Sequence, residues 1–196
     1  FSRRLLLQSS VDVNHLVASD LAAAIATAID AAAINGTGAS NQPRGVLQTS
    51  GIGAVVGGTN GLAPAWDHIV GLEEAIAAAN ADFGNLAYLT NPKARSKLRR
   101  TQRFASTNGE PIWGDPVDDL GMSRVAGYKA GVSTNVPSNL VKGSSGAICS
   151  AILFGNFSDL LIGMWSGLDI LVDPYSNSTT GTVRVVAFTD VDIGVR

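Results

Sequence analysis

One alanine-rich stretch constrains the fold of this chain more than any other feature. From about Val13 to Ile34, apolar residues recur three and four positions apart, which predicts one face of an α-helix. These residues are Val13, Leu16, Val17, Leu21, Ile25, Ala28, Ile29 and Ala32. A helix of about 20 residues is roughly 30 Å long. That length is large for a chain of 196 residues, so we expect the helix to be the spine of the fold.

The ends of this helix carry recognisable signals. Ser10 or Asp12 is expected to cap its start by accepting a hydrogen bond from a backbone N–H. Asn35 and Gly36 tolerate the left-handed conformation, so they predict a left-handed C-cap. A loop rich in glycine, proline, asparagine and serine follows, up to Gly53.

The rest of the chain predicts shorter elements. We expect a short strand at 54–56, a flexible loop at 57–63, a helix from Pro64 to about Ala81, and a strand at 86–89 that Asn91-Pro92 ends. β-branched and apolar residues then predict strands at 125–132, 151–154, 160–165, 168–172 and 182–193. Ser166-Gly167 suggests a tight hairpin between two of these strands.

Six basic residues lie close together with no acidic residue among them: Lys93, Arg95, Lys97, Arg99, Arg100 and Arg103. They could contact nucleic acid or an acidic neighbour. They could equally be the solvated face of a helix that buries Ala94 and Leu98. The second interpretation is favoured, because no aromatic residues are interleaved and no second basic segment is present.

The overall composition points to surfaces that another molecule covers. Charged residues make up 15% of the chain, against about 25% in typical soluble domains. Neighbouring subunits are the simplest cover, since interface cores are depleted of charge; an ordinary domain rich in alanine and glycine is the alternative. The net charge of -2 gives no global attraction to nucleic acid. No membrane span is expected, because Asp20, Thr27 and Asp30 interrupt the most apolar stretch.

The search for reactive groups finds no catalytic, cofactor or metal site. His15 and His68 have no partners at metal-ligand spacing, and the single cysteine, Cys149, is expected to be a buried structural thiol. The glycines from Gly36 form a broken phosphate-binding pattern that follows a helix instead of a strand. Asp190 and Asp192 are expected to face solvent. We therefore expect no enzymatic activity.

Several turns and caps occur in an order that suggests a family. They are Leu6-Leu7-Gln8-Ser9, Ile34-Asn35-Gly36-Thr37-Gly38, Gln42-Pro43-Arg44-Gly45-Val46-Leu47, Leu89-Thr90-Asn91-Pro92, Asn108-Gly109-Glu110-Pro111-Ile112-Trp113-Gly114 and Val132-Ser133-Thr134-Asn135-Val136-Pro137. No single one is specific, but their order and spacing resemble the tailed-phage major capsid proteins, which have the Hong Kong-ninety-seven-type capsid fold. The resemblance covers nearly the whole chain.

This resemblance implies an α+β fold with a spine helix. Residues 1–61 and 173–196 would form a peripheral domain, and residues 62–172 a sheet-centred axial domain. The chain would be a virion protein, made in the bacterial cytoplasm, that assembles into hexamers and pentamers of an icosahedral head around double-stranded DNA, without cofactors. Scaffold, protease and portal proteins are further partners that it implies. The loop from Thr107 to Met122 would meet its symmetry copies, with candidate axial contacts at Trp113, Gly114, Asp115, Pro116, Asp118, Asp119 and Gly121.

The chain also departs from this family pattern. The family's N-terminal arm and extended loop normally precede the spine helix, and the chain begins at Phe1, so we expect upstream sequence to be missing. No inter-subunit cross-link can be assigned to residues here. Two alternatives stay open: an encapsulin-like cargo shell, and a small α/β enzyme that binds phosphate at the Gly36–Gly45 loop.

Overall fold

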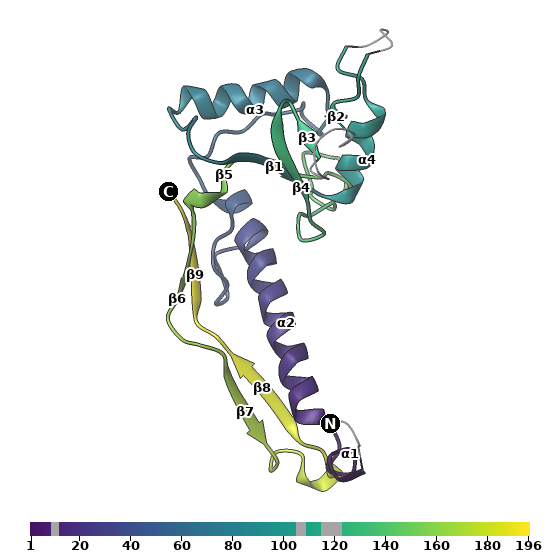
Figure 1. Ribbon diagram of the computed structural model, residues 1–196, viewed down its shortest axis with the longest axis vertical. Helices are drawn as coiled ribbons and strands as arrows, with labels where there is room; N and C mark the ends of the chain where they lie inside the picture. Colours follow the sequence, from purple (N-terminus) through teal and green to yellow (C-terminus); the bar gives the residue numbers. More distant parts are fainter. Residues whose placement is uncertain (9–11, 105–108, 115–122) are drawn as a thin grey trace. The chain divides into compact units, whose positions relative to one another are not determined.

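The computed structural model describes residues 1–8, 12–104, 109–114 and 123–196, and it consists of two units (Figure 1). Unit 1 contains Phe1–Val46 and Ile162–Gly194, and unit 2 contains Leu47–Leu161 with Val195–Arg196. The sequence analysis placed the domain changes later, after residues 61 and 172. Residues 169–172 group with unit 1 because they pair with another strand of that unit along their whole length.

The long helix of unit 1 forms as predicted. α2 spans Val13–Asn35, and a short helix, α1 (Arg3–Gln8), precedes it. At its start, the Asp12 carboxylate accepts a hydrogen bond from the His15 backbone N–H at 3.3 Å. The predicted left-handed C-cap is wrong, because neither Asn35 nor Gly36 has a positive φ. Gly36 is needed for a different reason: a Cβ there would overlap the carbonyl oxygen of Pro43.

The C-terminal strands form a two-stranded ribbon. β6 (Leu160–Met164) pairs with β9 (Val191–Val195), and β7 (Asp169–Asp173) pairs antiparallel with β8 (Arg184–Phe188). The predicted hairpin at Ser166-Gly167 is therefore wrong. Those residues interrupt the ribbon instead. On one side of the interruption Trp165 bonds to Asp190, and on the other side Asp169 pairs with Phe188. Three residues of one strand, 166–168, therefore lie opposite the single residue Thr189 of the other strand. The ribbon turns through η3 (Ser178–Thr180).

Unit 2 is built on a mixed five-stranded sheet in the order β2-β3-β4-β1-β5. Its strands are β1 (Leu86–Thr90), β2 (Trp113–Gly114), β3 (Arg124–Val125), β4 (Tyr128–Val132) and β5 (Ile152–Asn156). β1 pairs parallel with β4 and antiparallel with β5. The single strand predicted at 125–132 is split into β3 and β4 by a hairpin at Ala126-Gly127, where both residues have positive φ.

Two helices complete unit 2, and short 3-10 turns lie at η1 (Val46–Gln48) and η2 (Phe157–Asp159). α3 spans Trp66–Ala78, so it starts two residues later than predicted, and α4 spans Pro92–Arg100. The strand predicted at 54–56 is absent. This segment lies against α3 instead, since a Cβ on Gly71 would be 3.4 Å from the Val55 side chain.

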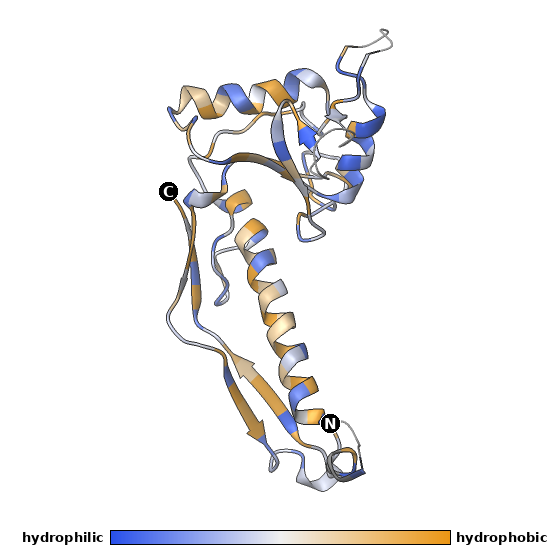
Figure 2. Ribbon diagram, viewed as in Figure 1, coloured by the Kyte–Doolittle hydropathy of each residue, from blue (hydrophilic) through white to orange (hydrophobic). Residues whose placement is uncertain are grey.

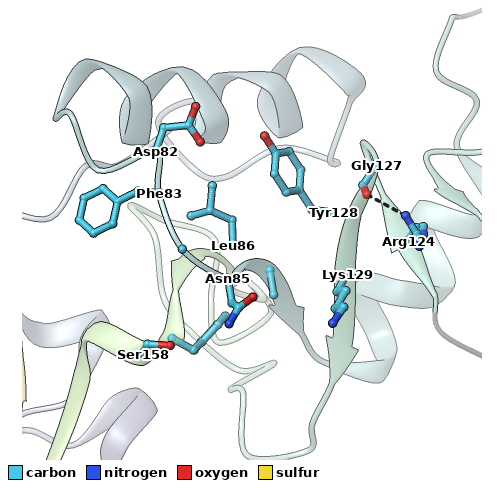
Figure 3. A pocket seen from close by; sticks show the side chains of 12 residues that line it. Asp82, Phe83, Asn85, Leu86, Arg124, Gly127, Tyr128, Lys129 and Ser158 are labelled. Atoms are coloured by element: carbon cyan, nitrogen blue, oxygen red, sulfur yellow. Dashed lines mark hydrogen bonds between the residues drawn. The ribbon is translucent and has the colours of Figure 1, made fainter.

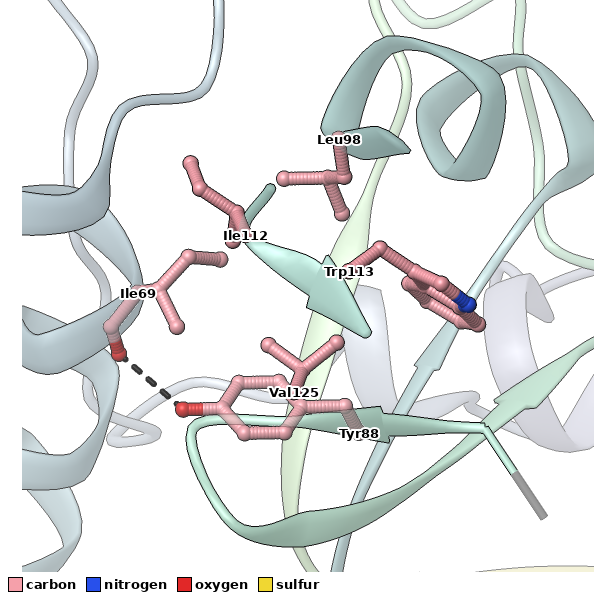
Figure 4. Close-up of a cluster of buried hydrophobic side chains, with 6 residues drawn as sticks. All are labelled: Ile69, Tyr88, Leu98, Ile112, Trp113 and Val125. Atoms are coloured by element: carbon pink, nitrogen blue, oxygen red, sulfur yellow. Dashed lines mark hydrogen bonds between the residues drawn. The ribbon is translucent and has the colours of Figure 1, made fainter. Parts of the chain in front are cut away.

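The core of unit 2 lies where the sheet meets these helices. Its fully buried side chains are shown in Figure 4 and are Ile69, Tyr88, Leu98, Ile112, Trp113 and Val125. The Tyr88 ring stacks on Phe154 with centroids 4.3 Å apart, and Tyr128 meets Phe154 edge-on at 5.1 Å. Ala94 and Leu98 are buried, so the prediction that α4 presents a solvated basic face is confirmed.

Asn91 joins the start of α4 to a distant loop. Its Oδ1 accepts from the Ala94 N–H at 2.8 Å, and its Nδ2 donates to the Pro137 carbonyl at 2.9 Å. Replacing Asn91 with alanine removes the cap and leaves the buried Ala94 N–H without its acceptor, so we expect a loss of about 2–3 kcal/mol in urea unfolding. Asn91→Ser keeps a capping oxygen without burying a charge and should cost less than Asn91→Ala; an equal loss would show that the cap contributes little.

The Tyr88 hydroxyl shares its one hydrogen between two acceptors, the half-buried Glu73 carboxylate and the buried Ile69 carbonyl. It donates to Glu73 Oε1 at 2.7 Å and to the Ile69 carbonyl at 3.1 Å. Burial of the hydroxyl, followed by the hydrogen bond to Glu73, raises the pKa of Tyr88. The folded state therefore holds this proton more tightly than the unfolded state, and the resulting stability is complete below the unfolded pKa of about 10 and is lost as the pH rises above it.

This linkage predicts how a Tyr88→Phe variant depends on pH. At pH 8 we expect the variant to be less stable than the wild type by about 1–3 kcal/mol, because both hydrogen bonds are lost. By pH 11 that difference should shrink by roughly 1.4 kcal/mol, since only the wild type has the extra proton to lose on unfolding. Urea unfolding at both pH values measures it, and a pH-independent difference would contradict the linkage.

Candidate functional site

The two-stranded ribbon of unit 1 exposes large apolar side chains on both of its faces. Successive residues of a strand point to opposite faces, yet Ile170 and Leu171 are 36% and 54% exposed. Two strands alone are marginally stable in water. Figure 2 shows the apolar character of the ribbon. Its exposed apolar residues are Leu161, Ile162, Met164, Trp165, Leu168, Ile170, Leu171, Val172, Tyr175, Phe188 and Val195.

α2 is also apolar, and most of its residues are exposed or half-buried. Val17, Leu21, Ile25 and Ile29 form a half-buried stripe, and the buried positions among the described side chains of the helix are Val13 at its start and residues 32–34 at its end. The predicted buried face is therefore narrower than expected, because Leu16 and Ala28 are exposed. Four alanines are also exposed on the helix, Ala22, Ala23, Ala24 and Ala26, beside polar residues such as Asp20 and Asp30. A helix and a ribbon of this kind are expected to be covered by another surface.

By length and composition alone, the His15–Asn35 segment of α2 is apolar enough to cross a membrane. The sequence analysis judged this stretch too interrupted, so that argument is corrected here. The same test is passed by core helices of soluble proteins and by signal sequences. Asp20 and Asp30 are both exposed on this helix, and a carboxylate in the middle of a bilayer is costly.

The Gly36–Gly45 loop uses its backbone donors internally. The Gly36 N–H bonds to Ala32 O, Gly38 N–H to Pro43 O and Gly45 N–H to Gly36 O, and the Thr37 N–H bonds to the Gln42 side chain. A phosphate-binding loop presents such N–H groups to its ligand. This loop instead closes on the end of α2, which argues against the phosphate-binding enzyme.

The predicted site residues lie in different settings. Trp113, in β2, is 2% exposed and belongs to the core of unit 2, with Gly114 beside it. The other candidate axial contacts, Asp115, Pro116, Asp118, Asp119 and Gly121, lie outside the described residues. The exposed ribbon residues were not identified as a site from sequence, although the low charge content was a general signal for covered surfaces.

The remaining titratable candidates have structural roles or face solvent. His15 is exposed, and His68 Nδ1 accepts a hydrogen bond from the Ala65 N–H at 3.1 Å at the start of α3. Cys149 is half-buried, less than expected, and its thiol donates to Ser145 Oγ at 3.3 Å. Asp190 and Asp192 are exposed. Within the described ranges, no group of three or more histidines, cysteines or carboxylates could hold a metal ion.

A hollow of about 730 Å³ lies in unit 2 beside the starts of β1 and β4 (Figure 3). Apolar side chains including Leu86 and Phe157 line it, together with charged residues of both signs, Asp82 and Lys129. Arg124, also in its lining, donates to the Gly127 carbonyl at 3.4 Å. The residues lining it include no histidine, cysteine or metal-binding cluster, so no catalytic constellation is recognised there.

Comparisons with known proteins agree on one family. The phage capsid family matches residues 1–196. The major capsid protein of Halomonas phage phiHAP-1 is 29% identical over 195 residues, and the match covers the whole of this chain but 29% of that protein. The chain therefore spans less than a third of this curated relative.

Solved structures show the same fold. The capsid of a native GTA particle, computed with C5 symmetry, has a TM-score of 0.72 and 26% identity, covering 99% of this chain and 65% of that one. The capsid of an empty GTA particle has a TM-score of 0.67 and 26% identity, with coverages of 94% and 68%. A chain of Gordonia phage Cozz, 17% identical with a TM-score of 0.58 and coverages of 98% and 66%, supports the fold alone.

Proposed function

The chain belongs to the phage capsid family, and we propose that it functions as the shell-forming part of a major capsid subunit. Its activity would be association with copies of itself. The observation that carries this proposal is the apolar ribbon of unit 1, which exposes large side chains on both faces. Many weak contacts of this kind, repeated by symmetry, sum to a stable shell.

In this proposal, unit 1 is the peripheral domain and unit 2, with its five-stranded sheet, is the axial domain. Subunits would form pentamers and hexamers of an icosahedral head. The C5 symmetry of the GTA capsids supports the five-fold ring. The shell would enclose double-stranded DNA without reading its sequence, because attraction to the phosphate backbone is sequence-independent. Scaffold, protease and portal partners stay predictions.

The alternatives are less well supported. The matched relatives are phage and GTA capsids, which favours a particle of that type over an encapsulin-like cargo shell. A membrane could cover α2, but the apolar ribbon would then still lack a partner. Burying the Asp20 and Asp30 carboxylates in a bilayer would also cost free energy.

Electron microscopy and light scattering of the full-length protein, expressed in bacteria, test the proposal. We expect rings or closed shells of megadalton mass. A protein that stays monomeric over a wide concentration range, with a scaffold supplied, would contradict the capsid function. Leu171→Asp should impair assembly, because it places a charge on the ribbon. Val141→Asp is the matched control, since Val141 is an exposed apolar residue of unit 2 that is not part of the ribbon.

A further inference from the structure

Between residues 62 and 103, acidic and basic residues occupy separate stretches of the chain. Between Leu62 and Pro92 the acidic residues are Asp67, Glu73, Glu74 and Asp82, and there is no lysine or arginine. Between Lys93 and Arg103 there are six basic residues and no acidic residue. The first block contains α3 and the second contains α4. The two helices of this unit therefore carry opposite charge.

The two helices contact opposite edge strands, although the start of α3 also reaches the region of α4. There the Arg103 guanidinium lies 4.9 Å from the Trp66 ring, and Ile69 shares the buried core with Leu98. α4 contacts β2, and α3 contacts β5 (Figure 1). β2 and β5 are the two outermost strands of the five-stranded sheet. The C-terminal half of α3 is the part that lies at β5, since a Cβ on Gly155 would be 3.9 Å from the Ile76 side chain, so Glu74 lies toward that edge and the basic helix α4 toward the other.

Several of these charges are already engaged within the unit. Glu73 accepts from the Tyr88 hydroxyl, Lys93 donates to the Ile148 carbonyl, and Arg103 pairs with Glu110 at 3.5 Å. Arg95 and Lys97 on the basic side are exposed, and so are Glu74 and Asp82 on the acidic side. None of these four side chains makes a hydrogen bond or ion pair with another residue in the part of the chain that the structure describes.

We propose that the basic face of α4 in one subunit docks against the acidic edge of unit 2 in the next subunit, at Glu74 and Asp82. This inference rests on the proposed function, because it concerns contacts between copies around a ring. A ring needs a heterologous interface, in which two different surfaces meet head to tail. Opposite charges on opposite edges satisfy that requirement. They also disfavour two-fold pairing of α4 with α4, because like charges would face each other.

The charges would set the register of the ring, and the apolar surfaces of unit 1 would supply most of the affinity. Complementary charges steer association and exclude wrong partners more than they add binding energy. Exposed pairs are also weakened by salt. We therefore expect ring formation by the wild type to slow as the ionic strength rises, while shells that are already closed persist.

Charge reversal in the full-length protein tests this interface. Arg95→Glu with Lys97→Glu should raise the protein concentration needed for assembly by about tenfold or more, and Glu74→Lys with Asp82→Lys should do the same, because like charges then meet across the contact. The four substitutions together should restore assembly to near the wild-type level. Lys142→Glu is the control, since it reverses an exposed lysine that lies outside α4 and is not among the residues that line the hollow with Asp82. Circular dichroism and thermal unfolding of unassembled subunits check folding in every variant.

The results distinguish failure of the proposed capsid function from failure of the proposed docking contact. Wild-type protein that does not assemble overturns the proposed function. If the wild type assembles and either reversal leaves assembly unchanged, or the combined variant is not rescued, the docking of α4 on Glu74 and Asp82 is wrong and the capsid function stands. Asp115, Asp118 and Asp119 are the competing acidic partners. If neutralising them to asparagine abolishes the effect of reversing α4, they are the partners and the proposed edge is overturned.

Discussion

Replacing Gly45 with alanine is expected to detach the loop after α2 from the end of that helix. A Cβ at Gly45 would lie 2.5 Å from both Ala32 O and Gly36 N, and 2.6 Å from Asn35 N. All three are backbone atoms, so no side-chain rotation can relieve the overlap. The substitution would also separate the Gly45 N–H from Gly36 O, which are 2.9 Å apart. We expect a cost of roughly 3 kcal/mol or more, at the upper end for overpacking.

Two measurements check this expectation. Hydrogen exchange of the last turn of α2 should become faster, and limited proteolysis should cleave within residues 36–48 of the variant but not of the wild type. Gly194→Ala is the matched control, because no atom lies within 4 Å of a Cβ built there, and it should leave both readouts unchanged. Protection equal to that of the wild type in Gly45→Ala would mean that the loop can shift at little cost.

Local signals in the sequence were sufficient for α2 and α4, although α1 was not predicted. The apolar spacing predicted α2 to within one residue at its C-terminal end, because a helix closes its hydrogen bonds within four residues. The same holds for Asn91-Pro92, which ends β1 and starts α4, where Asn91 supplies the cap. Ala94 and Leu98 were correctly predicted as the buried positions of α4 because they lie one turn apart.

Non-local pairing was not predictable in the same way. Ser166-Gly167 has the composition of a tight turn, but β6 pairs with β9, which starts 31 residues later in the chain, and β7 pairs with β8, which starts 15 residues later. Composition cannot distinguish a turn from an interruption in a long ribbon. Gly36 shows a similar limit: the sequence indicated that glycine was required, and the close approach of Pro43 provides the reason.

The sequence predicted the proposed assembly surfaces only in part. The low charge content predicted covered surfaces, but the apolar residues of β7 and β8 look the same in sequence as those of a buried strand. Only the pairing shows that this ribbon has two strands and that both of its faces are open. The opposite charges of α3 and α4 were visible in the sequence, whereas their separation to opposite sheet edges required the strand order.

Trp113→Ala is expected to unfold unit 2, and the same substitution at Trp165 is not. Trp113 is 2% exposed and packs in the core with Leu98 and Val125, so its truncation should cost about 3–5 kcal/mol. Trp165 is 74% exposed, so its truncation should leave the unfolding of unit 2 within about 0.5 kcal/mol of the wild type.

Trp165→Ala should instead impair assembly, because it removes a large apolar contact from the ribbon. Urea unfolding followed by near-UV circular dichroism, together with light scattering of the full-length protein, separates the two effects. A Trp113→Ala variant that keeps its unfolding midpoint but fails to assemble would make Trp113 a contact between subunits, as the sequence first suggested. A lower urea concentration at the unfolding midpoint would instead show that Trp113 acts within the subunit, because a core side chain affects assembly only through the fold that it stabilises.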